Sequence, residues 1–159
     1  MPSLICRTVQ LSPVVPAARA MAEAEEVPWA KRLFEIAGNV FAVTGRTERE
    51  YRRSLAGVRE RLVFYGSTPA YRAVPKHHGW DALQEELRTL SLRGRWKEMG
   101  WFVDDDVSNA FAVVAEDSAT AGQLIRERYT DVYHRVSISP APNSDPALAL
   151  AILDGIRSD

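Results

Sequence analysis

Cysteine and histidine are scarce in this sequence. Cys6 is the single cysteine, and three histidines accompany it among 159 residues. One cysteine cannot form a disulfide within the chain, and these residues are too few to build a Cys/His zinc site. We therefore expect no metal centre, and we expect a reducing compartment, the cytoplasm, as the location of the protein.

Long apolar runs and an excess of one charge are missing as well. The longest apolar run, residues 147–153, is far shorter than the roughly 20 residues that span a bilayer. Pro13 and Pro16 interrupt the weakly apolar N-terminal stretch, which is untypical of a cleaved signal peptide. The 20 Lys and Arg residues face 21 Asp and Glu residues, for a net charge of −1. The sequence therefore predicts no association with membranes or nucleic acids.

The composition that remains is that of a globular domain. Hydrophobic residues make up 46% of the chain and charged residues 26%, proportions that are typical of folded globular proteins. At about 150 residues per domain, the length predicts a single hydrophobic core.

Three short segments have the composition and length of β-strands: residues 39–44, 110–115 and 133–139. The first two are nearly continuous apolar runs, which is typical of strands buried on both faces of a parallel sheet. More than a dozen residues with helical patterns separate the three segments, and such long connections favour parallel β/α units. The fold class is therefore predicted to be α/β.

The clearest helix begins at a capping box. In this motif the Thr47 hydroxyl accepts a hydrogen bond from the Glu50 amide, while the Glu50 carboxylate reaches back to the Thr47 amide. The helix is expected to run to about Phe64. One apolar stripe is available for packing: Tyr51, Leu55, Val58 and Leu62.

Two further helices follow in the last third of the chain. Asp117 or Ser118 is expected to cap the first of them, and Pro146 is expected at the first position of the second, after Asp145. In the middle third, the acidic residues 104–106 indicate another helix start. Three aromatic residues nearby are expected in the core or on the packing face of inserted helices: Trp96, Trp101 and Phe102.

Family motifs occur in four segments of the chain. These are FEIAGNVFAVTGRTEREY (34–51), VFYGSTPAYRAV with HGWDAL (63–83), GRWKEMGWFVDDDVSNAFAVVAE (94–116) and DVYHRVSIS (131–139). Together they resemble the C-terminal portion of the luciferase-like monooxygenases, in the branch that uses the 5-deazaflavin coenzyme F420. The FYGSTPAYR stretch is the most specific part of this resemblance.

The resemblance implies a (β/α)8 TIM barrel, of which this chain would hold the C-terminal portion with a helical insertion. A whole barrel needs about 250 residues, more than this chain has. Residues 34–142 would then belong to the barrel and residues 143–159 would form a C-terminal helix. Residues 1–33 do not resemble the family and are expected to be an irregular or helical lead-in.

Barrel enzymes place their functional groups at the C-terminal ends of the strands. This rule selects Thr44 and Gly45 after the first predicted strand, and Ser139 at the end of the third, as candidate cofactor-binding residues. For Thr44 and Ser139 the alternative is a hydroxyl that only satisfies its own turn.

A second candidate group lies in the FYGSTPAYR stretch. A helix is expected to begin at Ser67 or Thr68, and the free amides and hydroxyls at its N-terminus suit a phosphate or carboxylate. Arginine and tyrosine side chains could add a charged hydrogen bond and a stacking face. The alternative is an ordinary helix cap with a surface arginine. The candidate cofactor-binding residues are Gly66, Ser67, Thr68, Tyr71 and Arg72.

The resemblance implies an F420-dependent oxidoreductase, with FMN as the alternative cofactor, that transfers a hydride between the cofactor and a small organic substrate. No residue can be assigned as a catalytic acid or base. The alternative function is non-catalytic: a partial barrel, either a fragment or an interaction module, that pairs with itself as a homo-oligomer or with a separately encoded N-terminal barrel half.

Overall fold

The computed structural model describes residues 36–139 and 144–158. Its sheet has three strands: β1 (Ala37–Val43), β2 (Ala112–Val114) and β3 (Arg135–Ser139). Both strand pairs are parallel, as predicted, and the strand order is β2-β1-β3. The predicted lead-in, residues 1–33, lies outside the described residues.

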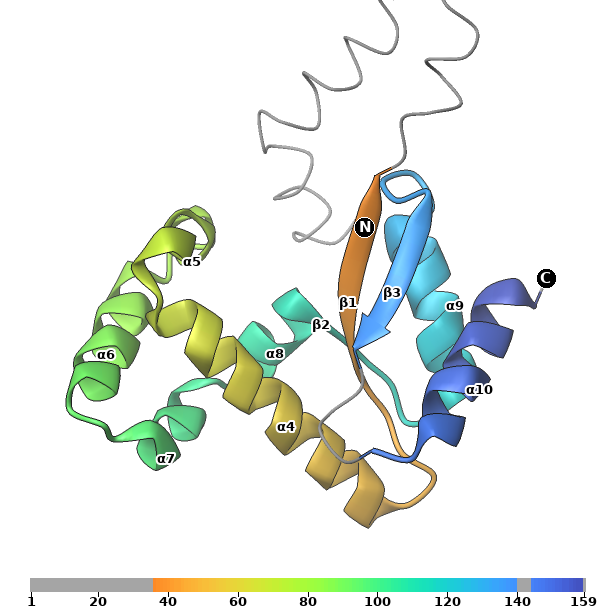
Figure 1. Cartoon of the computed structure of the whole chain (residues 1–159), viewed down its shortest axis with the longest axis horizontal. Helices are drawn as coiled ribbons and strands as arrows, with labels where there is room; N and C mark the ends of the chain where they lie inside the picture. Colours follow the sequence, from red (N-terminus) through yellow and green to blue (C-terminus); the bar gives the residue numbers. More distant parts are fainter. Residues whose placement is uncertain (1–35, 140–143, 159) are drawn as a thin grey trace, which may run out of the picture.

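Strand β1 is buried on both faces, as its continuous apolar pattern predicts. Val40 and Ala42 belong to one hydrophobic cluster and Val43 to the other, and none of the three is more than 2% exposed. Two helices, α9 (Ser118–Tyr129) and α10 (Pro146–Arg157), pack near the β3 side of the sheet (Figure 1). The sheet is therefore the middle layer between two groups of helices.

Helix α4 (Glu48–Ser67) follows β1. Its predicted apolar stripe faces the hydrophobic cluster that contains Val43, and Val58 and Leu62 are buried there. The Glu50 amide donates to the Thr47 hydroxyl at 3.2 Å, as the capping box predicts. The Glu50 carboxylate instead accepts from the Arg46 amide at 2.9 Å, so the second half of the predicted box is wrong. No helix within the described residues combines the length and the apolar character of a membrane span.

Short helices fill the connection from α4 to β2 and form a group to one side of the sheet (Figure 1). Two of them are 3-10 turns. In chain order they are η1 (Pro69–Tyr71), α5 (Ala73–His77), α6 (Asp81–Leu92), α7 (Trp96–Met99), η2 (Gly100–Phe102) and α8 (Asp105–Phe111). The Asp104 carboxylate caps α8 through the Val107 amide at 2.9 Å, which confirms the predicted helix start.

The aromatic residues of this connection do not lie in the core, so the first of their two predicted placements is wrong. Trp96, Trp101 and Phe102 are 48%, 84% and 42% exposed. The helix α7 has a single turn, and such a short helix turns few side chains inward. Met99, which is fully buried, takes the inward position and leaves the neighbouring aromatic rings at the surface.

Both late helices begin at the predicted caps. The Asp117 carboxylate accepts from the Thr120 amide at 2.9 Å, and Asp145 accepts from the Ala147 amide at the same distance. The hydrogen bond from Ala147 and a contact with the Arg46 guanidinium hold the pKa of the Asp145 carboxyl below its usual range. The N-terminus of α10 is thereby attached to the turn that follows β1.

The strand order differs from the consecutive order of a closed barrel. In a (β/α)8 barrel, strands that follow each other along the chain are neighbours, whereas β2 and β3 lie on opposite sides of β1. Apolar clusters also cover both faces of the sheet, as in a doubly wound α/β fold. The α/β class with a parallel sheet is confirmed, and the partial barrel stays a prediction.

The contact between α9 and α10 yields a test of the packing. A Cβ atom on Gly122 would lie 2.5 Å from the Ile152 carbonyl oxygen and 2.7 Å from the Gly155 Cα. Because these backbone atoms cannot yield unless the helices separate, we expect Gly122→Ala to lower the free energy of unfolding by about 1–3 kcal/mol.

Urea unfolding measures this loss, and Gly100→Ala is the matched control. A Cβ on Gly100 would meet nothing within 4 Å, so we expect that variant to stay within about 0.5 kcal/mol of the parent chain. Equal losses in the two variants would contradict the proposed tight contact.

Candidate functional site

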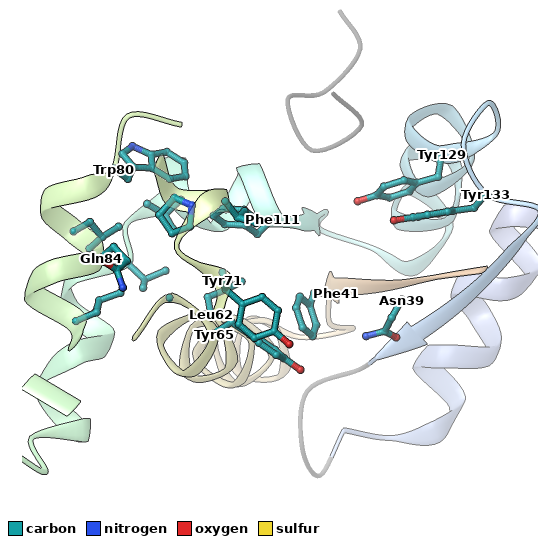
Figure 2. Close-up of a pocket in the computed structure, with 17 residues that line it drawn as sticks. Asn39, Phe41, Leu62, Tyr65, Tyr71, Trp80, Gln84, Phe111, Tyr129 and Tyr133 are labelled. Atoms are coloured by element: carbon teal, nitrogen blue, oxygen red, sulfur yellow. The ribbon is translucent and has the colours of Figure 1, made fainter. Parts of the chain in front are cut away.

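A cavity of about 300 Å³ opens between β1, α4 and α6. Aromatic rings form much of its wall, and we refer to it as the aromatic cavity (Figure 2). The rings come from separate segments of the chain, so only the folded chain brings them together: Phe41, Tyr65, Tyr71, Trp80 and Phe111.

The rings hold one another in position. Tyr65, near the end of α4, has its ring centroid 6.1 Å from that of Phe41 and 5.1 Å from that of Tyr71, the latter edge to face. Trp80 lies just before α6, with its ring 5.7 Å from that of Phe111. Such spacings are typical of stable aromatic pairs, so the wall is formed before any ligand binds.

His78 supports this wall from outside the cavity lining. Its ring stacks on Trp80 with 4.7 Å between centroids and an interplanar angle of 11°. Burial lowers the pKa of the His78 imidazole, and the charge of His77 lowers it further. The imidazole therefore favours its uncharged form at neutral pH, and it adds no charge behind Trp80.

A few polar groups interrupt the apolar lining. Gln84, on α6, is only 3% exposed and lines the cavity. Asn39, on β1, lies at another part of the wall, and its side-chain oxygen accepts from the Ser139 hydroxyl at 2.8 Å. Tyr129 and Tyr133 complete the polar set on the side of β3 (Figure 2). The cavity thus offers amide and hydroxyl groups against an aromatic surface.

Two of the predicted site residues, Gly66 and Tyr71, line the cavity. The expected phosphate cradle around them is not formed. The Ser67 and Thr68 hydroxyls both donate to the Phe64 carbonyl, at 3.0 and 2.8 Å.

The phosphate cradle is absent because helix α4 ends later than predicted. Helix α4 continues to Ser67, so the two hydroxyls cap the C-terminal end of a helix where a new N-terminus was predicted. Only the 3-10 turn η1 begins there, without a side-chain cap. Arg72 is 3.5 Å from the Glu85 carboxylate and exposed. A long amphipathic helix can end a few residues late without any change in its periodic pattern, so the sequence predicts this boundary too early.

The residues predicted at the end of β1 lie outside the cavity lining. Thr44 is 3% exposed, and its hydroxyl has no hydrogen-bond partner in the described part of the chain. Its amide donates to the Ser54 hydroxyl at 3.4 Å. A Cβ on Gly45 would lie 2.3 Å from the Tyr51 nitrogen, so the glycine permits close packing of the turn against α4. Packing explains Gly45, and Thr44 stays a predicted cofactor-binding residue.

Ser139 lies at the end of β3 and reaches the cavity only indirectly. Its hydroxyl donates to Asn39, a cavity residue, and its carbonyl accepts from Arg61 at 3.4 Å. The guanidinium of Arg61 also lies 5.8 Å from the centre of the Phe41 ring. Ser139 therefore positions Asn39 rather than lining the cavity itself.

The sequence reasoning missed several cavity residues: Phe41, Trp80, Gln84 and Phe111. Gln84 carried a readable signal, because it lies one position after Leu83 and three before Leu87 in an otherwise apolar helical stripe. A polar residue within such a stripe is turned inward with its neighbours. The aromatic residues carried no signal of this kind, since an apolar ring in a strand or turn is ordinarily core.

The described residues contain no group of three or more His, Cys, Asp or Glu side chains that could hold a metal ion.

Comparison with known families identifies the family of the chain. The sequence model of the family described as "Luciferase-like monooxygenase" matches residues 10–147. The chain belongs to the luciferase-like monooxygenase family. The matched range includes every strand of the sheet, and it begins before residue 34, the first residue of the family motifs.

Relatives of this luciferase-like chain are considerably longer. "Uncharacterized protein Rv1360" of Mycobacterium tuberculosis and "Uncharacterized protein Mb1395" of Mycobacterium bovis are each 43% identical to it over 103 residues. The matched part is 65% of this chain but only 30% of each relative. The comparison with solved structures found no match.

Thr44 offers a test of whether its buried hydroxyl lacks a partner in the folded protein. Because its buried hydroxyl has no partner, we expect Thr44→Val to raise the free energy of unfolding by about 1 kcal/mol. The same change at Thr47, whose hydroxyl caps α4, should lower it by about 1 kcal/mol. Chemical denaturation of both variants measures the two shifts. A loss of stability in Thr44→Val would show that the hydroxyl has a partner.

Proposed function

We propose that this chain is part of an F420-dependent oxidoreductase, with FMN as the alternative cofactor, that transfers a hydride between the cofactor and a small organic substrate. Membership of the luciferase-like monooxygenase family supports the reaction class. The aromatic cavity carries the proposal for this chain, because it is a preformed, largely apolar site for a flat organic ring.

The residues present fit one part of such a cofactor. When bound, a deazaflavin or flavin supplies the hydride chemistry from its ring system. Tyr65, Tyr71 and Trp80 would hold a flat ring and exclude water from it. The phosphate of the cofactor finds no cradle at residues 66–72, where both hydroxyls are already bound to the helix end. Phosphate contacts would then come from the part that the longer relatives have in addition.

The pairing of the strands supports the partial barrel, which is also part of this proposal. Strand β2 has only three residues and pairs with the last three of β1. If β2 is an added strand, β1 and β3 become consecutive neighbours, as a (β/α)8 barrel requires. Within the described residues β3 is paired on one side only. Its other edge is available to the next strand of a barrel.

Tryptophan fluorescence tests cofactor binding in the purified chain. Trp80 lines the cavity, whereas Trp101 is 84% exposed and lies outside it. We expect F420 or FMN to quench the fluorescence as it is added. Trp80→Phe should remove most of the quenching and Trp101→Phe should leave it unchanged. The reason is that contact quenching requires the cofactor ring to lie against the tryptophan. Flat titrations with both compounds would contradict the proposed function of this chain.

The alternative function, a non-catalytic interaction module, is favoured by one observation. Strand β3 has an unpaired edge within the described residues, and such an edge can pair with a strand of another chain. We expect an interaction module of this kind to form a homo-oligomer, or a complex with a separately encoded N-terminal barrel half. Light scattering over a range of concentrations measures self-association directly. A single monomeric species at every concentration, together with cofactor binding, would count against this alternative and in favour of the enzyme.

A further inference from the structure

We propose that the aromatic cavity selects an uncharged, planar ligand whose edge carries adjacent carbonyl and N–H groups, and that Gln84 recognises this edge. The inference rests on the proposed function in one respect, that the cavity is a ligand site. It goes beyond that function by naming the chemical class of the ligand and the residue that recognises it.

The absence of charge in the lining selects an uncharged ligand. No Asp, Glu, Lys, Arg or His side chain is among the described residues that line the cavity. A carboxylate or an ammonium group in such a site would lose its hydration without gaining a partner, which is costly in an apolar environment. His78, behind Trp80, favours the uncharged form and gives no compensation.

The aromatic walls select a flat shape. Phe41, Tyr65 and Tyr71 lie on one side of the cavity, and Trp80 with Phe111 lies on another (Figure 2). Rings on separate elements can contact both the face and the edge of a planar ligand, and each such contact is favourable at ordinary van der Waals distance. A flat ring system therefore fills this space with more contact than a branched aliphatic chain of similar volume.

Gln84 supplies the directional contact. The side chain is 3% exposed, lies on the same side of α6 as the buried Leu87, and reaches toward the cavity (Figure 2). Within residues 36–139 and 144–158, its amide forms no side-chain hydrogen bond, yet it is not sealed in the protein as the Thr44 hydroxyl is. The amide therefore keeps its donor and acceptor groups open to the cavity, where a ligand can pair with them.

The primary amide of glutamine determines which edge it prefers. It presents one carbonyl acceptor beside one N–H donor, and the complementary edge is a ligand N–H beside a ligand carbonyl. Both the ring of a flavin-type cofactor and a lactam-containing organic substrate have such an edge. The shared chemistry is an uncharged cyclic amide, and the source is decided by experiment.

Three bicyclic probes separate the elements of the proposal: 2-quinolone, 1-methyl-2-quinolone and quinoline-2-carboxylate. The first has the carbonyl and N–H edge, the second lacks the N–H, and the third is an anion on a related ring. Calorimetric titration of the full chain is expected to show binding of 2-quinolone. The N-methyl compound should bind about 3- to 10-fold more weakly, the effect of one net hydrogen bond. The carboxylate should bind at least tenfold more weakly.

Variants at Gln84 test the assigned residue. Gln84→Met keeps the length of the side chain and removes the amide, so it should weaken 2-quinolone about 10- to 100-fold, through the loss of two net hydrogen bonds, and the N-methyl compound only about 3- to 10-fold, because that compound keeps the carbonyl alone. Gln123→Leu, at an exposed position of α9, is the control and should affect neither ligand. If Gln84→Met does not fold by circular dichroism, the comparison of the three probes on the parent chain still decides the proposal.

Competition with riboflavin, a flavin without a phosphate, identifies the source of the ligand. Displacement of 2-quinolone by riboflavin assigns the cavity to the cofactor ring, and its absence assigns the cavity to the organic substrate. The proposal is overturned if 2-quinolone does not bind, if the carboxylate binds equally well, or if Gln84→Met weakens both quinolones alike. These outcomes are independent of the F420 and FMN titrations, so a chain that binds no cofactor can still bind the lactam.

Discussion

Strand β1 has to satisfy two hydrophobic cores at once, and the arrangement of the chain follows from that requirement. Val40 and Ala42 face the cluster that includes α9 and α10, whereas Phe41 and Val43 face the cluster built with α4 and α6. A strand with two buried faces needs helices on both sides, and parallel neighbours supply them because each crossover carries a helix. The sheet is small, so the stability of the fold depends heavily on this one strand.

The aromatic cavity arises because one of these clusters is incompletely filled. The connection from α4 to β2 leaves the sheet, forms several short helices and returns, and its rings approach Phe41 without closing the space in front of it. Full packing would have removed the cavity and with it any ligand site. The buried amide of Gln84 is consistent with this view, since a side chain that served only stability would be apolar at that position.

Membership of the luciferase-like monooxygenase family gives the cavity a chemical context, while the length of the relatives limits what this chain can supply. The matched part is 30% of each relative. The hydroxyls of the FYGSTPAYR stretch are bound to the end of α4, so under the proposed function the phosphate contacts would fall on another part of the whole protein.

The sequence by itself determined the elements and most of their starts. The strand positions, the parallel pairing and the caps at Asp104, Asp117 and Asp145 follow from local chemistry, because a carboxylate at the N-cap accepts from an amide two or three residues further on. Only the tertiary structure decided that Trp101 lies at the surface, that α4 runs to Ser67, and that Gln84 lines one cavity with aromatic rings from distant segments. Each of these depends on contacts between segments that are distant in the sequence. Such contacts override the local preferences that a sequence pattern reports.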